Sequence, residues 1–197
     1  MAVIFGYLYL LFATFTLVFQ HQYGFSQGTV GLAYLGIGVG SLIGLCVFAA
    51  LSDRLMRVFA KGGEMKAEYR LFPWILGSLF VPAGLFWYGW SAEKKLPWMM
   101  PIIGTGLVGL GTVATFMSIQ TYMVDSFQHQ AASALAANMV LRSLVGAFLP
   151  LAGVKMYAAL GLGWDNSLLG FLALAMAPVS WFMFRYGEAI RARSAVA

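Results

Sequence analysis

Six long apolar runs divide the chain, and they constrain its fold more than any motif does. They are predicted at residues 2–19, 30–51, 71–90, 97–123, 132–160 and 167–184. A helix needs about 20 mostly apolar residues to cross the hydrocarbon core of a bilayer. Within the bilayer the backbone must satisfy its own hydrogen bonds, which a helix does. The sequence therefore predicts an all-α, polytopic membrane bundle of six transmembrane helices that forms a single domain over residues 1–197.

The composition excludes a soluble protein. Hydrophobic residues make up 61% of the chain and charged residues 10%, and the mean hydropathy is +0.81. A soluble domain carries about 25% charged residues, so this chain could not cover its own surface in water. The net charge of +5 is spread over gaps between apolar runs, unlike the basic patch of a nucleic-acid binder. The lipid bilayer is the expected partner, and nucleic acid is not.

The basic residues also predict the topology. Eight Lys and Arg residues lie on the side that holds the 52–70 loop, the 124–131 loop and the 185–197 tail. The opposite side has two, Lys94 and Lys95. Because cytoplasmic loops carry the excess of positive charge, we expect both termini to be cytoplasmic.

Small residues mark the second and fifth spans. Gly36, Gly40 and Gly44 recur every fourth residue on one helix face, and Gly146 and Pro150 interrupt the fifth span. Small residues at this spacing let helices approach closely in lipid, which predicts a helix-packing seam. Glycine and proline breaks at matching places in two halves are also typical of transporters. Ordinary packing is the alternative, and it is favoured for any single glycine.

Three hydroxyl side chains share a face of the fourth span: Thr105, Thr112 and Thr115. A polar strip on a membrane helix should face protein or a water-filled cavity. Two interpretations stay open, a cavity lining and a hydroxyl that bonds its own helix backbone.

Charges at or within the spans are the stronger functional signal. Arg142 lies deep in the fifth span, where a charge is costly unless it is paired or hydrated. Asp125, near the end of the fourth span, is its expected partner in a gating pair. The alternative is that Arg142 extends to the cytoplasmic interface. Asp53 and Arg54 end the second span as a further gating candidate, and an ordinary interfacial charge pair is the alternative there.

The sequence offers little support for a catalytic or metal-binding site. It has no zinc-protease HExxH and no phosphate-binding P-loop pattern. Its one cysteine, Cys46, and its two separated histidines offer no ligand-spaced set. No catalytic role, metal or cofactor is expected.

Several segments together resemble the C-terminal half of a major facilitator superfamily transporter, most like the fungal drug:proton antiporters. They include Tyr23-Gly24-Phe25-Ser26, Glu68-Tyr69-Arg70-Leu71, the runs 31–36, 120–125 and 132–138, Leu141-Arg142-Ser143 with Pro150-Leu151, Met156-Tyr157, and Gly163-Trp164. The resemblance covers nearly the whole chain.

This resemblance implies that the six spans are the last six of twelve. The first and fourth spans would line a substrate cavity with Tyr7, Tyr9 and Phe12 and with the three threonines. The second and fifth spans would meet a missing N-terminal half, which would also hold the proton-coupling acids. The basic glycine-containing motif that follows an Asp-Arg pair in such transporters is absent after Asp53-Arg54.

The expected function is transport of small organic solutes by alternating access. The chain would act as the C-terminal half of a secondary transporter, of the proton-coupled multidrug or polyamine type, in the plasma membrane. Its partners would be a small-molecule substrate and either the missing half or a second copy. One alternative is a truncated, non-transporting fragment or scaffold that needs a partner half. Another is a polytopic membrane enzyme.

Overall fold

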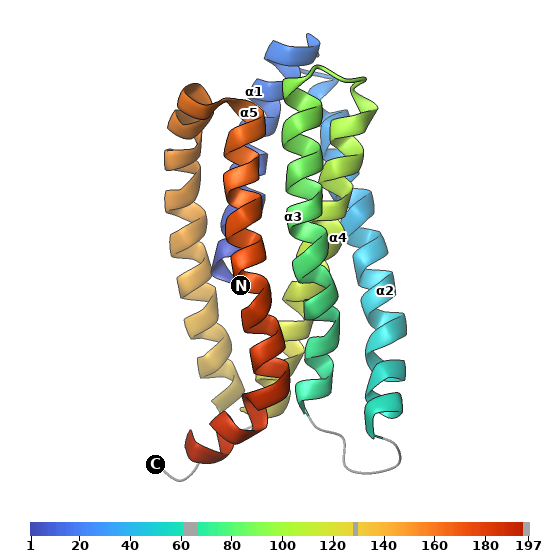
Figure 1. The fold of residues 1–197 in the computed structure, drawn as a ribbon, viewed down its shortest axis with the longest axis vertical. Coiled ribbons are helices and arrows are strands. Elements are labelled where there is room, and N and C mark those ends of the chain that lie inside the picture. Colours follow the sequence, from blue (N-terminus) through green and yellow to red (C-terminus); the bar gives the residue numbers. More distant parts are fainter. Residues whose placement is uncertain (61–66, 128–129, 195–197) are drawn as a thin grey trace.

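Long helices that run side by side make up the structure, a computed structural model (Figure 1). It describes residues 1–60, 67–127 and 130–194, without the side chains at 53, 55–57, 59–60, 67–68, 152–155, 158 and 188–194. Over these residues the elements are α1 (Ala2–Tyr23), the 3-10 turn η1 (Val30–Ala33), α2 (Tyr34–Ala60), the 3-10 turn η2 (Ala67–Leu71), α3 (Phe72–Glu93), α4 (Met99–Ser126) and α5 (Ala131–Ser194).

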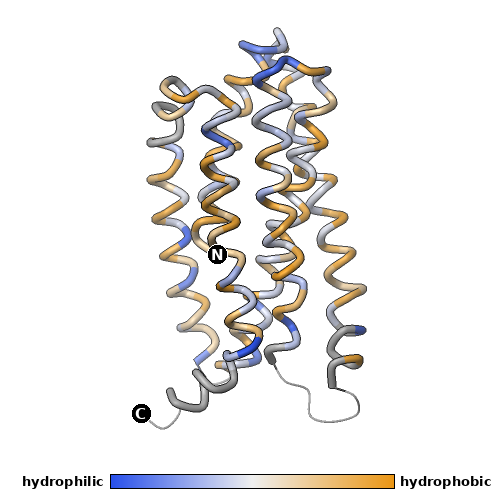
Figure 2. The backbone as a smooth tube through the Cα atoms, in the orientation of Figure 1, coloured by the Kyte–Doolittle hydropathy of each residue, from blue (hydrophilic) through white to orange (hydrophobic). Residues whose placement is uncertain are grey.

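Six helical stretches of the described chain are long and apolar enough to cross a membrane. They are Ala2–Tyr23, Val30–Ser52, Tyr69–Glu93, Met99–Ser126, Ala131–Leu151 and Ala159–Gly187. Apolar residues run along all of them, and polar residues gather near the ends of the bundle (Figure 2). The predicted fold class, an all-α bundle of six spans, is confirmed.

Glycine and proline set the ends and breaks of the helices. Gly24 ends α1 in a left-handed conformation (φ 65°), and its N–H donates to the carbonyl of Gln20. Pro73 stands in the first turn of α3, where a missing N–H is harmless. Gly161 adopts φ 78° and ψ 168° inside α5, and this break turns one helical run into two spans. The sequence prediction placed the boundary between these spans within 161–166.

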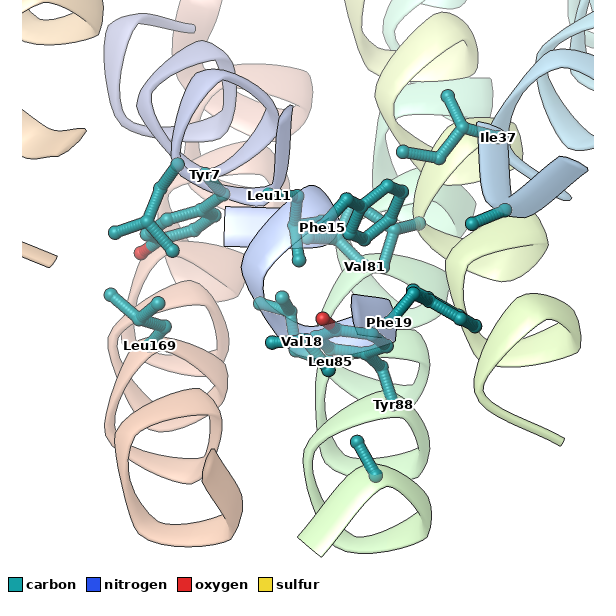
Figure 3. Close-up of a cluster of buried hydrophobic side chains, with 14 of the residues drawn as sticks. Tyr7, Leu11, Phe15, Val18, Phe19, Ile37, Val81, Leu85, Tyr88 and Leu169 are labelled. Carbon is teal, nitrogen blue, oxygen red and sulfur yellow. The ribbon is translucent and has the colours of Figure 1, made fainter. Parts of the chain in front are cut away.

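The core lies where α1 packs against α3 and the second half of α5 (Figure 3). Tyr7, Phe15 and Phe19 of α1 are fully buried, together with Tyr88 of α3. Phe15 lies 5.5 Å from Tyr88 and 6.1 Å from Phe19 between ring centroids. Leu169 of α5 completes the same cluster, so α1 is held to the bundle by large side chains.

Glycines, rather than large side chains, hold α2 to α4. A Cβ added at Gly36 would meet the carbonyl oxygen of Ile102, and one at Gly40 would meet the backbone of Gly106. A Cβ at Gly44 would lie 2.8 Å from the carbonyl oxygen of Leu110. The three glycines therefore let the two backbones touch.

This contact corrects the expected position of the glycine seam. The α2 glycines face α4 of the same chain, and Gly146 lies against the Tyr9 ring of α1, with a Cβ-to-ring distance of 3.0 Å. Pro150, on the same helix, is half-buried. Periodicity identified a packing face on α2, but it could not say which helix the face meets.

The first half of α5 is the least covered part of the bundle, followed by the second half of α5 and by α2. α2 and the first half of α5 lie at opposite edges (Figure 1). Between Ala131 and Leu151, Gly146 is the buried residue, whereas Met139, Leu144, Phe148 and other large apolar side chains are exposed. Lipid or a further protein surface must cover these faces.

The glycine contact makes a direct prediction about stability. Gly40→Ala should destabilise the full chain by about 1–3 kcal/mol, because the new methyl group overlaps the Gly106 backbone. Gly38→Ala is the matched control, since a Cβ there meets nothing within 4 Å. Thermal unfolding of the purified chain in detergent measures the difference. Equal unfolding temperatures for the two variants would contradict the contact.

Candidate functional site

An arginine beside two adjacent aromatic rings marks a candidate site on the α1–α4 face. The guanidinium carbon of Arg142 lies 4.5 Å from the ring centroid of Phe5 and 5.4 Å from that of Phe116. The two rings are 5.5 Å apart. A guanidinium within about 6 Å of a ring face is attracted by the ring quadrupole. The site thus joins α1, α4 and the first half of α5 around one positive charge.

Aromatic side chains continue from this arginine along α1. Phe5, Tyr9 and Phe12 follow at the four- and three-residue spacing of one helix face. Tyr9 is 49% exposed and Phe12 is 38% exposed, although the bundle buries other aromatic residues of α1 completely. Tyr34, at the start of α2, lies 5.8 Å from Phe12 and donates its hydroxyl hydrogen to the Phe12 carbonyl. We call these residues, with Phe116 and Arg142, the aromatic strip.

The structure gives Asp125 a different partner from the expected one. Its carboxylate pairs with Arg70 of η2, and both side chains are partly exposed. Arg142 lies 11 residues into α5, which places it about 16 Å along the helix from its start. Among the described residues Arg142 has no carboxylate partner. The expected Asp125–Arg142 pair is therefore not formed, because the two residues lie at different depths.

Four of the expected cavity residues are buried inside the chain's own packing. Tyr7 is fully buried in the core, and Thr105, Thr112 and Thr115 are at most 5% exposed. Thr105 donates to the carbonyl of Ile102 at 2.7 Å, which is the backbone-bonding alternative. The Thr115 hydroxyl stands 2.7 Å from a Cβ built on Gly77 of α3. These threonines lie between helices, and Tyr9 and Phe12 are the expected residues that remain on an open face.

The Asp53–Arg54 candidate is only partly visible. Arg54 is exposed on α2, and the side chain of Asp53 lies outside the described residues. A gating role for either residue stays a prediction.

One serine motif that sequence reasoning overlooked has the wrong geometry for catalysis. Gly24, Ser26 and Gly28 have the GxSxG spacing of a hydrolase nucleophile. That motif requires a sharp turn from a strand into a helix. Here Gly24 caps α1, and the Ser26 hydroxyl lies 3.1 Å from that of Thr29 in an exposed connection. The spacing is therefore coincidental.

Comparisons with known proteins agree on one family. The model of the Major Facilitator Superfamily matches residues 1–150. The MFS-type transporter penM of Penicillium rubens is 60% identical over 190 residues, which cover 96% of this chain and 37% of that protein. The MFS transporter cpaT of Aspergillus oryzae is 57% identical over 98% of this chain and 39% of its own length. The MFS-type transporter tndD of Aspergillus flavipes is 55% identical over 96% of this chain and 36% of its own length.

The chain therefore spans less than two fifths of the length of these relatives, between 36% and 39%. No solved structure gives a significant match.

A double-mutant cycle tests the arginine site. Arg142→Met and Phe116→Leu should show a coupling free energy of about 0.5–2 kcal/mol, because each variant removes the same cation–π contact. Phe148→Leu is the control partner, since this ring is 67% exposed on the same helix. Unfolding of the purified chain supplies the four free energies of each cycle. Additive effects in the Phe116 cycle would show that the contact contributes nothing.

Proposed function

The chain belongs to the major facilitator superfamily, and on that premise we propose that it is the C-terminal half of a secondary transporter. As a family member it is an integral, multi-pass membrane protein of a transporter family. The finer proposal is that it moves small organic solutes by alternating access together with a second half. The observation that carries this proposal is the half-exposed aromatic strip.

The position of the strip supports a cavity wall. Most of its side chains come from α1 and α4, and Tyr34 of α2 and Arg142 of α5 complete it at the two edges. Those edge helices expose large apolar side chains, such as Val39 of α2 and Phe148 of α5. A second half that packs on both edges would enclose the strip between the halves. It would also give Arg142 an enclosed, polar setting instead of lipid.

The strip also bears on the kind of substrate. Phe5, Tyr9 and Phe12 offer flat apolar surface, and the tyrosines add hydroxyl groups that can donate or accept hydrogen bonds. Aromatic or amphipathic solutes suit such a lining. We propose the proton-coupled multidrug or polyamine type of transport on the family resemblance alone. The plasma membrane and cytoplasmic termini are proposed likewise, the latter from the excess of basic residues on one side.

One observation favours a second candidate function. Because the chain spans 36–39% of its relatives' lengths, it could be a membrane fragment that transports nothing by itself. Such a fragment would bind a partner half or a second copy through the exposed edges of α2 and α5.

Reconstitution of split halves separates these functions. Three samples are prepared. One contains the chain alone, one contains the remaining part of the 60% identical Penicillium rubens relative alone, and one contains both. Rhodamine 6G, a lipophilic cation, and fluorescein, an anion, serve as aromatic probes in proteoliposomes with a pH gradient. We expect at least one probe to move only when both parts are present. Transport by the chain alone would contradict the half-transporter proposal, and no transport by any combination would favour the fragment.

The strip itself is tested in the combination that transports. Tyr9→Ala and Phe12→Ala should each lower the initial rate several-fold, because they remove half-exposed contact surface from the proposed wall. Phe171→Ala is the control, an aromatic ring 59% exposed that packs on Phe86 of α3, away from the strip. Rates that fall equally in the control variant would remove the strip from the transport pathway.

A further inference from the structure

A buried polar cluster lies at the end of the bundle where Gly161 breaks α5. It consists of Thr14 of α1 and of Tyr157, Asp165 and Asn166 of α5, which we call the Asp165 cluster. The side-chain amide of Asn166 donates to the Tyr157 hydroxyl at 3.1 Å and to the Leu162 carbonyl at 2.8 Å. Thr14 donates to the Leu10 carbonyl at 2.8 Å, and the Tyr157 hydroxyl donates to the side-chain oxygen of Asn166 at 3.4 Å. The donors in this cluster are therefore already used.

Asp165 is the member whose hydrogen bonds are not accounted for. The residue is 0% exposed, and neither carboxylate oxygen has a hydrogen-bond partner. Its neighbour Asn166, also 0% exposed, is fully engaged. An ionised carboxylate held away from water without a donor or a cation is strongly unfavourable. The site needs an occupant that cancels the charge.

The charged and titratable groups around the cluster leave Asp165 without a counter-charge. On α3, Glu93 accepts the backbone N–H of Gly163 and adds negative charge, and Tyr88 is buried and neutral. On α1, His21 is exposed. Lys94 lies over the Trp90 ring, 5.8 Å from its centroid. Among the described side chains no cation pairs with Asp165.

The chemistry of the cluster favours a proton over a metal ion. A hard cation requires six or more oxygen ligands in most protein sites. The described residues contain no group of three His, Cys, Asp or Glu side chains that could hold a metal ion. A single proton cancels the charge of Asp165 and asks for no further ligand.

A cavity adjoins the cluster. A cavity of about 200 Å³ lies between α1 and α5, and Thr14, His21, Gln22 and Tyr157 contribute to its wall. Its wall is largely apolar, and Thr14 and Tyr157 bring hydroxyl groups to it. Thr14 and Tyr157 belong both to the cavity wall and to the cluster. The cavity therefore adjoins the cluster at Thr14 and Tyr157.

We propose that Asp165 is a proton-binding site of this chain. Its carboxyl carries a proton while the side chain is held away from water. When water enters the cluster, the O–H bond of the acid breaks, the proton passes to water as hydronium, and the carboxylate stays behind hydrated. The site lies in this chain rather than in a second half, so it goes beyond the proposed function and does not depend on which solute is carried.

Infrared spectroscopy of the purified full chain tests the proposal. The chain has three aspartates, Asp53, Asp125 and Asp165. Labelling aspartate with ¹³C shifts any carboxyl band that comes from these residues. At neutral pH we expect one labelled C=O band of a protonated acid, which Asp165→Asn removes. Asp125→Asn is the matched control, and it should leave the band unchanged because Asp125 is paired with Arg70.

A stability measurement gives a second, independent readout. A free aspartate ionises above about pH 4, whereas the folded chain keeps its proton, so unfolding releases a proton. Stability of the native chain should therefore fall as pH rises above that value, and Asp165→Asn should lose this part of the pH dependence. The amide resembles the protonated acid in shape, so the variant should fold.

Three results would overturn the proposal. The first is the absence of any labelled acid band at neutral pH. The second is a band that persists in Asp165→Asn. The third is a band that appears only in Lys155→Met, which would assign the counter-charge to Lys155. If Asp165→Asn does not fold, the labelled wild-type band, compared with Asp53→Asn and Asp125→Asn, still decides the outcome. None of these outcomes depends on whether the chain transports a solute.

Discussion

The close approach of α4 to its two neighbours is the contact on which the rest of the bundle depends. On one side Gly36, Gly40 and Gly44 of α2 meet the α4 backbone, and on the other side Gly77 and Gly84 of α3 meet it again. Apolar side chains gain nothing by leaving lipid for a neighbouring helix, so close packing must hold membrane helices together. Small residues on both sides of α4 provide that packing. They also draw Thr105 and Thr115 into helix interfaces, and they leave the α1–α4 face to carry the aromatic strip.

The strip and the Asp165 cluster each hold one ionisable group, in two different places within the spans. The strip is half-exposed, and its charge, Arg142, is stabilised by two rings rather than by a carboxylate. In the cluster Thr14, Asp165 and Asn166 are buried and Tyr157 is partly exposed, and the charge-bearing group, Asp165, has no hydrogen-bond partner among the described residues. An ionisable side chain within a membrane span lowers the stability of the bundle, so folding alone does not explain Arg142 or Asp165. A transporter half that contributes a cavity wall and a protonatable group accounts for both.

The sequence could predict the spans and the fold class because both follow from the length and apolarity of local segments. The sequence could also predict the family resemblance, because that resemblance depends on short segments and on their order along the chain. The sequence could not predict which helix or side chain each of these residues contacts. Periodicity placed the three threonines on one face, but the glycines that decide what this face meets lie on α2 and α3. Asp125 was matched with Arg142 because both lie near spans, whereas depth along the helices pairs it with Arg70. Asp165 was missed because it lies within the predicted connection at 161–166, and its burial arises only when α5 resumes after Gly161.

Aqueous accessibility of Tyr9 tests the central claim, that the aromatic strip lines a water-filled cavity between two halves. In a Cys46→Ser background, Tyr9→Cys and Phe171→Cys are placed in a chimera in which this chain replaces the matching segment of the Penicillium rubens relative. A membrane-impermeant maleimide is then applied to both sides of membrane vesicles. If the strip lines the cavity, the cysteine at position 9 is labelled rapidly, whereas the cysteine at position 171, which faces lipid, is labelled little. Equal, slow labelling at the two positions would mean that the strip faces lipid, and it would contradict the account.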